Sequence, residues 1–215
     1  MRTRIKFCGF TREEDICYAV RLGVDAIGFV FWGGSPRAVS VEQAKRWVKA
    51  LPPFVSSVGL FVNEQREVVR QIADEVGLTH LQFHGDETGD YCSEWDRPVI
   101  KAVRVNAATS ILSLDRDFPN EIAFLLDSDH PGYGGSGQAF DWAQVPTQWR
   151  RPWVLAGGLD KDNVQQAIRL LQPWAVDVSS GIEERGPDSK PVKGSKCKEA
   201  MNDFVGAVIQ ANGWR

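Results

Sequence analysis

Eight short apolar runs alternate with longer segments along this sequence, and this alternation constrains the fold more than any other feature. The runs are rich in Val, Ile and Phe, which is typical of β-strands. Most of the intervening segments carry apolar residues at helical spacing. A chain in which strands and helices alternate forms a parallel sheet that is covered by helices. The expected strands are 4–8, 26–31, 55–62, 80–84, 99–105, 123–127, 153–156 and 175–179.

The expected helices begin at residues that suit helix N-termini. Thr11 with Glu14, and Ser40 with Gln43, each match a capping box, in which two side chains satisfy backbone N–H groups. Single N-caps are predicted at Asn63, Asp86, Asp141 and Asp160. The helical segments are 13–22, 41–51, 66–76, 163–171 and 196–210, with weaker helices after the fourth and fifth strands and a sixth at 142–149 that contains Pro146.

Eight such units within 215 residues predict one domain, residues 1–215, folded as a single (β/α)8 barrel of the TIM type. The alternative α/β architecture is a doubly wound open sheet. Its dinucleotide-binding form carries a GxGxxG motif after the first strand. The first turn here reads Cys-Gly-Phe-Thr over residues 8–11, which favours the barrel.

Charge and hydropathy exclude several classes of protein. The chain has 28 acidic and 25 basic residues and a net charge of −3, so it lacks the basic surface of a nucleic-acid-binding protein. No stretch approaches the roughly 20 apolar residues that span a bilayer, and the polar N-terminus does not match a signal peptide. Cys8, Cys17, Cys92 and Cys197 show no CxxC spacing and are expected as free thiols. We therefore expect a cytoplasmic protein with no nucleic-acid or membrane partner.

Reactive side chains and glycines collect where the expected strands end. In a barrel, these strand ends and the loops after them form the face that carries the chemistry. Gly157-Gly158 and Ser180-Gly181 follow the seventh and eighth strands, where barrels commonly bind phosphate through backbone N–H groups. A pair of plain tight turns is the alternative. The glycine-rich loop 132–137 fits a lid or a further source of backbone donors.

Cys8 ends the first strand and is a candidate base or nucleophile. A lone cysteine is more often a small buried hydrophobic residue. Strand periodicity, however, puts Lys6 and Cys8 on the face opposite Ile5 and Phe7, and this face points into the barrel. A buried Lys6 needs a counter-charge, and Asp177 on the neighbouring eighth strand is the predicted partner. We expect Lys6 to lower the pKa of Cys8.

Polar residues also end the fourth and sixth strands. Asp127 closes the sixth strand and is either a loop cap or a catalytic acid. His80, Gln82 and His84 share one face of the fourth strand. Because Gln is a poor transition-metal ligand, we predict no metal site here. A polar interior layer is expected instead, with His84 reaching the rim.

Trp32 and Arg37 follow the second strand. Trp32 lies at the rim and is suited to stacking on an aromatic substrate. Arg37 follows Pro36, and an arginine on such a stiff loop can hold a carboxylate through two hydrogen bonds. Taken alone, Arg37 is interpreted as a solvated surface residue.

A set of motifs runs through the chain in strand order. They are 5–12 (IKFCGFTR), 28–31 (GFVF), 35–37 (SPR), 81–87 (LQFHGDE), 101–105 (KAVRV), 125–127 (LLD), 134–137 (GGSG), 140–142 (FDW), 155–159 (LAGGL) and 176–183 (VDVSSGIE). As an ordered set covering nearly the whole chain, they resemble the phosphoribosylanthranilate isomerase family. One departure is at 194–197, where Gly-Ser-Lys-Cys stands in place of the family's Gly-Val-Lys-Asp.

The resemblance implies a cofactor-free and metal-free isomerase at the third committed step of tryptophan biosynthesis. The family carries out an Amadori rearrangement of N-(5-phosphoribosyl)anthranilate to 1-(2-carboxyphenylamino)-1-deoxyribulose 5-phosphate. By position, Cys8 matches the family's general base, Asp127 its general acid and Arg37 the arginine that holds the anthranilate carboxylate. The expected substrate contacts are Arg37, His84, Gly135, Gly157, Gly158, Ser180 and Gly181. The expected partner is a phosphorylated small molecule, and the expected state is a monomer or homodimer.

Two other functions compete with this one. Another phosphosugar barrel is the first, either the sister isomerase of histidine biosynthesis or indole-glycerol-phosphate synthase. The sister isomerase would pair two aspartates where this chain offers Cys8 and Asp127, and the synthase would need a catalytic lysine and glutamate at strand ends. A non-catalytic barrel is the second, and it predicts loss of a reactive group, yet both are present.

Overall fold

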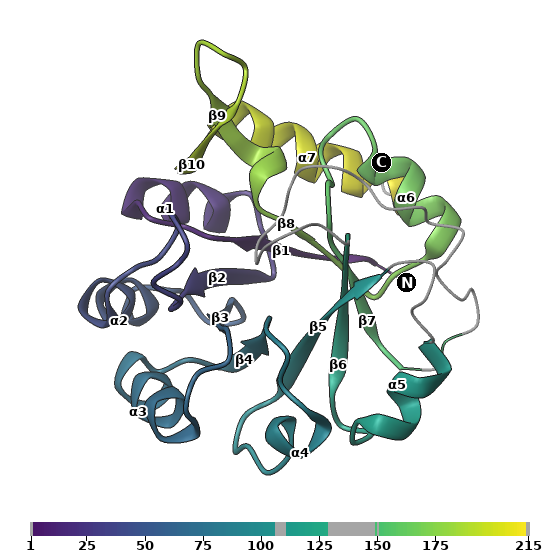
Figure 1. The fold of residues 1–215 in the computed structure, drawn as a ribbon. Coiled ribbons are helices and arrows are strands. Elements are labelled where there is room, and N and C mark those ends of the chain that lie inside the picture. The colour runs from purple at the N-terminus through teal and green to yellow at the C-terminus, as the bar shows by residue number, and fades with distance from the viewer. Residues whose placement is uncertain (1, 106–110, 129–148, 150, 214–215) are drawn as a thin grey trace.

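Eight parallel strands close into a barrel in the computed structural model of this chain (Figure 1). The structure describes residues 2–105, 111–128, 149 and 151–213. Each strand pairs with the next, and β1 pairs with β8 to close the ring. The predicted (β/α)8 barrel is therefore confirmed, and the open sheet is excluded. The strands are β1 (Arg4–Cys8), β2 (Ala26–Val30), β3 (Ser56–Phe61), β4 (His80–Phe83), β5 (Val99–Val105), β6 (Ala123–Ser128), β7 (Trp153–Leu155) and β8 (Ala175–Val178).

Helices lie outside the ring of strands, as Figure 1 shows. Their bounds agree closely with the predicted segments, and the third helix agrees at both ends. The expected helix 142–149 falls almost wholly outside the described residues. The helices are α1 (Glu13–Arg21), α2 (Val41–Lys49), α3 (Arg66–Val76), α4 (Gly89–Cys92), α5 (Ile111–Asp117), α6 (Val164–Leu171) and α7 (Lys198–Ala211), with a 3-10 turn, η2 (Ser180–Ile182), after β8.

A short antiparallel hairpin follows the turn after β8. Its strands, β9 (Glu183–Arg185) and β10 (Pro191–Lys196), place Glu183 opposite Lys196. Pro191 occupies the first position of its strand, where a proline is tolerated despite its missing N–H. The hairpin therefore brings two charged residues face to face beside the end of β8.

The predicted capping box at Ser40 is present, whereas the one at Thr11 is wrong. Ser40 Oγ accepts from the Gln43 N–H at 3.2 Å, and the Ser40 N–H donates to Gln43 Oε1 at 3.1 Å. Helix α1 instead has Arg12 as its N-cap, with no side-chain cap. The Thr11 hydroxyl donates to the Gly194 carbonyl at 2.8 Å. This hydroxyl therefore binds the β9–β10 hairpin and does not cap α1.

The predicted single N-caps at Asn63, Asp86 and Asp160 are wrong. Gln65 and Thr88 are the N-caps of α3 and α4, in place of Asn63 and Asp86. Asn163 is the N-cap of α6, although Asp160 Oδ1 accepts from the Asn163 N–H at 3.1 Å and so satisfies part of that helix start. The predicted cap Asp141 lies outside the described residues.

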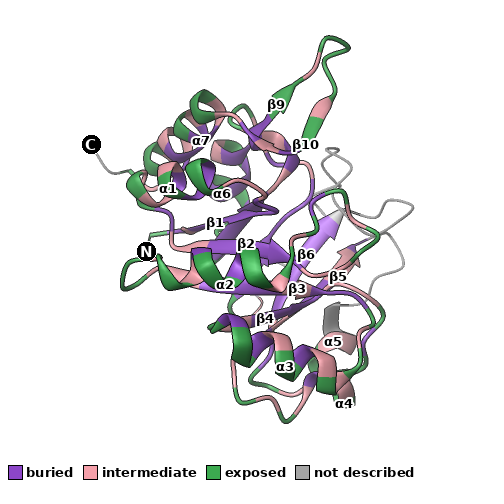
Figure 2. Ribbon diagram, turned by 90° about the vertical axis from the view of Figure 1, so that its left-hand side faces the viewer, coloured by how far each residue is buried: buried purple, intermediate pink, exposed green. Residues whose placement is uncertain are grey.

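Side chains of the strands divide into two layers. The main core joins one strand face to the helices, and Figure 2 shows the strands as mostly buried with the outward faces of α2 and α3 exposed. Fully burying each phenylalanine of this layer contributes about 1.5–3 kcal/mol. Its largest members include Phe7, Phe29, Phe61, Phe83 and Phe124. A smaller cluster on the opposite strand faces fills the barrel interior, with Ala102, Leu125, Val154, Ala156 and Ala175. No helix among the described residues is long and apolar enough to cross a membrane.

Candidate active site

A pocket opens at the end of the barrel where the strands terminate. It gathers the predicted residues Cys8, Asp127, Arg37, His84, Gly157, Gly158 and Ser180, together with Trp32. Residues far apart in sequence therefore meet at one mouth, because parallel strands all end on the same side of the barrel. The predicted contact Gly135 lies outside the described residues.

Cys8 sits at the end of β1 and is 5% exposed. Gly28 lies opposite it in the register of β1 and β2. A Cβ atom at Gly28 would come within 2.7 Å of the Cys8 Sγ and 3.1 Å of its Cα. Only glycine at position 28 therefore leaves the thiol room to point into the pocket.

Lys6 and Asp177 form the predicted ion pair, with Lys6 Nζ 2.9 Å from Asp177 Oδ1. Both side chains are buried, and they are paired in the register of β1 and β8. Lys6 lowers the pKa of the Cys8 thiol, as expected, through its charge and its hydrogen bond. Burial raises that pKa by more, and the Asp177 charge also raises it, so the net shift is upward.

Asp127 is held by a chain of hydrogen bonds that starts inside the barrel. His84 Nε2 lies 3.2 Å from Asp127 Oδ2, and Gln82 Nε2 lies 3.1 Å from His84 Nδ1. Gln82 and Asp127 thus hold the two ring nitrogens of His84 from opposite sides. Among the described residues, Gln82 Oε1 is the buried side-chain oxygen or nitrogen without a hydrogen-bond partner. The predicted polar layer on β4 thus orients the carboxyl group at the rim.

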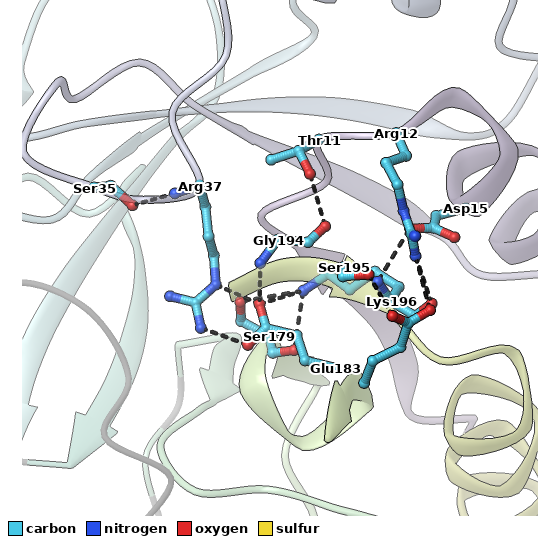
Figure 3. A network of polar contacts seen from close by, with 11 residues as sticks. Thr11, Arg12, Asp15, Ser35, Arg37, Ser179, Glu183, Gly194, Ser195 and Lys196 are labelled. Carbon is cyan, nitrogen blue, oxygen red and sulfur yellow. Dashed lines mark hydrogen bonds and ion pairs between the residues drawn. The ribbon is translucent and has the colours of Figure 1, made fainter. Parts of the chain in front are cut away.

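Arg37 is buried, so its interpretation as a solvated surface residue is wrong. Its Nε donates to Glu183 Oε1 at 2.6 Å and its Nη2 donates to Glu183 Oε2 at 2.8 Å (Figure 3). Burial alone raises the pKa of Glu183, but the hydrogen bonds from Arg37 and the charge of Lys196 bring that pKa below its ordinary value. Glu183 is therefore a charged carboxylate inside the protein.

Glycines shape the turns after β7 and β8. Gly157 and Gly158 have φ angles of 80° and 66°, in the left-handed region that favours glycine. A Cβ atom at Gly181 would come within 2.0 Å of the Leu159 carbonyl oxygen, so the two turns can pack together only with glycine there. The Asn163 side chain donates to the Gly158 carbonyl at 2.8 Å and fixes the first turn. This close packing leaves backbone groups at the pocket wall.

The family model for N-(5'-phosphoribosyl)anthranilate isomerase matches residues 5–193. This chain belongs to that family. Relatives named N-(5'-phosphoribosyl)anthranilate isomerase include one from Dechloromonas aromatica, 47% identical over 99% of both chains. Another, from Pseudomonas fluorescens, is 48% identical over 95% of this chain and 98% of its own.

Solved structures of the same family share the fold. Phosphoribosyl anthranilate isomerase from Thermotoga maritima superposes with a TM-score of 0.85 at 40% identity and covers 98% of this chain and 99% of its own. A phosphoribosyl anthranilate isomerase in complex with reduced 1-(o-carboxyphenylamino)-1-deoxyribulose 5-phosphate gives a TM-score of 0.79 at 36% identity, covering 98% and 99%. Membership of this isomerase family decides against the competing phosphosugar barrels.

Two residues of this isomerase-family site were not singled out from the sequence. Glu183 holds Arg37, and Lys196 Nζ lies 3.4 Å from Glu183 Oε1 and 3.0 Å from the Ser179 carbonyl oxygen. Burial lowers the pKa of Lys196 to about 8, and the charge of Glu183 offsets this only in part. The alternation of side chains between the two faces of β10 could have indicated that Lys196 points inward. Only the pairing of β9 with β10 shows that its ammonium group reaches Glu183.

Proposed function

We propose that this chain converts N-(5'-phosphoribosyl)anthranilate to 1-(2-carboxyphenylamino)-1-deoxyribulose 5-phosphate in tryptophan biosynthesis, with Asp127 as general acid and Cys8 as general base. The observation that carries this proposal is that both side chains line one pocket with Arg37, the Gly157-Gly158 turn and Ser180, the residue before Gly181. An acid, a base and two anion contacts at one mouth are what the rearrangement requires.

Ring opening is the first step. Asp127 gives its proton to the furanose ring oxygen as the bond from that oxygen to C1 breaks. The nitrogen lone pair forms a double bond to C1, which leaves a Schiff-base cation and a new hydroxyl group. The contact between His84 Nε2 and Asp127 Oδ2 supports this role, because it orients the carboxyl group within the pocket.

Proton removal at C2 is the second step. The Cys8 thiol gives up its proton to solvent in the open pocket as the Schiff-base cation forms. The thiolate then takes the C2 proton, and the electron pair of the broken bond forms the C1=C2 double bond of an enolamine while neutralising the cation. The enolamine then tautomerises to the ketone, gaining a proton at C1 and losing the one on the C2 hydroxyl. Because burial raises the pKa of Cys8, the Schiff-base cation beside it is needed to favour the thiolate at this step.

The two ends of the substrate orient the sugar between acid and base. We assign the anthranilate carboxylate to Arg37 and the phosphate to Gly157, Gly158, Ser180 and Gly181, with Gly135 as a further contact. Holding both ends fixes the reacting carbons, and orientation of this kind is a major part of enzymatic rate enhancement. Proton transfers alone balance the reaction, so we assign no cofactor or metal to it.

The fluorescence of the anthranilate substrate tests the activity directly. We expect purified protein to consume the substrate rapidly without added cofactor, and to do so equally in the presence of a metal chelator. A protein that leaves the fluorescence unchanged would contradict the proposed activity. Loss of activity with the chelator would instead contradict the metal-free mechanism.

The functional unit is proposed to be one domain, residues 1–215, working in the cytoplasm as a monomer or homodimer. Both states are supported by a structural neighbour described as generated monomers of dimeric phosphoribosylanthranilate isomerase from Thermotoga maritima. That neighbour is 34% identical, covers 96% of this chain and has a TM-score of 0.81.

A further inference from the structure

Two cations share one buried carboxylate beside the pocket. Arg37 holds Glu183 through both of its oxygens, at 2.6 and 2.8 Å, and Lys196 Nζ lies 3.4 Å from Glu183 Oε1. The Gly194 N–H also donates to Glu183 Oε1 at 2.9 Å. Figure 3 shows the Arg37, Glu183 and Lys196 side chains meeting at this point. The side chains of Lys196 and Glu183 are both 0% exposed, so water does not screen this arrangement.

The buried charges around Lys196 do not cancel. Lys6 is neutralised by Asp177, and Asp15, which accepts from the Lys196 backbone N–H, is paired with Arg12 at 2.8 Å. Cys8, whose pKa is raised by burial, is an uncharged thiol in the resting site. Among the buried side chains, Arg37 and Lys196 carry two positive charges against the single negative charge of Glu183. Lys193, whose charge also acts on Arg37 and Glu183, is exposed to solvent, which screens it. The region therefore holds one surplus positive charge, which a buried site tolerates poorly without a counter-ion.

One edge of the Arg37 guanidinium group is not occupied by Glu183 and is available to a counter-ion. A guanidinium group carries five N–H donors in a fixed plane, and Glu183 occupies the edge formed by Nε and Nη2. Among the described residues, Nη1 makes no hydrogen bond, and Arg37 lines the pocket. The edge formed by Nη1 and Nη2 therefore remains for a second carboxylate.

We propose that Lys196 is a positioning and specificity residue, which supplies the second positive charge that allows Arg37 to hold Glu183 and a substrate carboxylate at the same time. The chain of charges from substrate carboxylate through Arg37 and Glu183 to Lys196 is neutral only when a carboxylate is bound. The site thus selects N-aryl ribosylamine phosphates that bear a ring carboxylate over those that lack one. This inference rests on the proposed assignment of Arg37 to the anthranilate carboxylate.

Lys196 acts through Glu183, because its buried ammonium donates to the Ser179 carbonyl and does not line the pocket. When Lys196 loses its proton, Arg37 and Glu183 form a neutral pair, and a carboxylate entering the site meets no net positive charge. The pKa of Lys196, lowered to about 8 by burial, places this change within an accessible pH range. Carboxylate selection is thus present below that pKa and lost above it.

Two ligands that differ only in the ring carboxylate provide the test. One is reduced 1-(o-carboxyphenylamino)-1-deoxyribulose 5-phosphate, and the other is the same compound made from aniline. Calorimetry gives the ratio of their dissociation constants. The contributions of the phosphate, the sugar and the nearby Cys8 to binding are the same for both ligands and cancel in this ratio. For the wild type we expect the preference for the carboxylate to fall at least about tenfold between about pH 6.5 and about pH 9.5.

Variants assign the change to Lys196. Lys196→Met should show a weak, pH-independent preference, whereas Lys190→Met, an exposed lysine at the tip of the same hairpin, should behave as the wild type. A Lys196→Met protein that keeps the wild-type preference and its pH dependence overturns the inference. Should Lys196→Met not fold, the wild-type series decides, and a preference that is constant with pH overturns the inference. A wild type that binds both ligands equally at every pH contradicts the assignment of Arg37 itself.

Discussion

Gly28 shows at the scale of single residues how an absent side chain sets the position of the proposed base. The Cys8 thiol occupies the space that any Cβ atom at position 28 would fill, and the nearest backbone atom, the Cys8 Cα, is itself only 3.1 Å away. The thiol and the strand that carries it would both have to shift. The position of the Cys8 thiol on β1 is therefore determined partly by β2.

Replacing Gly28 should impair catalysis. We expect Gly28→Ala to lower kcat at least about tenfold, since a displacement of about 1 Å can cost a hundredfold in rate. Steady-state kinetics by substrate fluorescence measures the effect. Gly206→Ala is the matched control, because a Cβ atom at Gly206 meets nothing within 4 Å. Equal turnover in both variants would show that the thiol position is not critical.

The proposed acid and base make the sharpest prediction at this scale. Cys8→Ser and Asp127→Asn should each lower kcat at least about a hundredfold, the lower limit of general acid or base catalysis. Because both side chains keep nearly the same size, thermal unfolding should change little. Cys17→Ser, at an exposed cysteine, should leave turnover unchanged. Near-normal turnover in either site variant would remove that residue from the mechanism.

At the scale of elements, local patterns predicted the strands better than the contacts made at their ends. Alternation of apolar residues placed β1 and β5 at their observed bounds and put Lys6 inside the barrel opposite Asp177. Arg37, by contrast, was misread because its partner Glu183 lies 146 positions along the chain. Such pairing is fixed by the closure of the barrel and the β9–β10 hairpin, which a local window of sequence does not contain.

Helix α7 illustrates the same point through its N-terminus. Cys197 is its N-cap, with extended φ and ψ angles of −92° and 121°, and makes no side-chain cap hydrogen bond. The family pattern quoted above has aspartate at this position, and a carboxylate there can accept from the first free N–H groups of the helix. The Cys197 side chain does not supply this contact.

Restoring an acidic cap should therefore stabilise the fold. We expect Cys197→Asp to raise the free energy of unfolding by about 1 kcal/mol, the usual contribution of an N-cap. Urea unfolding followed by circular dichroism measures it, with Cys197→Ala as the control for simple loss of the thiol. An aspartate variant no more stable than the alanine variant would show that α7 gains nothing from a cap.

At the scale of the whole molecule, the two ends of the barrel carry different features. The end where strands terminate holds the pocket and the buried charges, whereas the loop between α2 and β3, at the opposite end, presents Phe54. This side chain is 102% exposed and its residue has a φ angle of 71°, so the loop turns the ring fully outward. An exposed phenylalanine gains about 1.5–3 kcal/mol when it becomes fully buried.

A homodimer with its interface at the loop between α2 and β3 would bury Phe54 and leave the pocket at the opposite end of the barrel open. We expect sedimentation velocity to show a dimer for the wild type and a monomer for Phe54→Ser at the same concentration. Because the ring lies away from the pocket, kcat of the variant should equal that of the wild type. A control at Leu170→Ser, an exposed apolar residue on α6, should leave the dimer intact. A wild type that sediments as a monomer assigns the chain to the monomeric alternative and leaves Phe54 as a surface residue, whereas a Phe54→Ser protein that remains a dimer places the interface elsewhere.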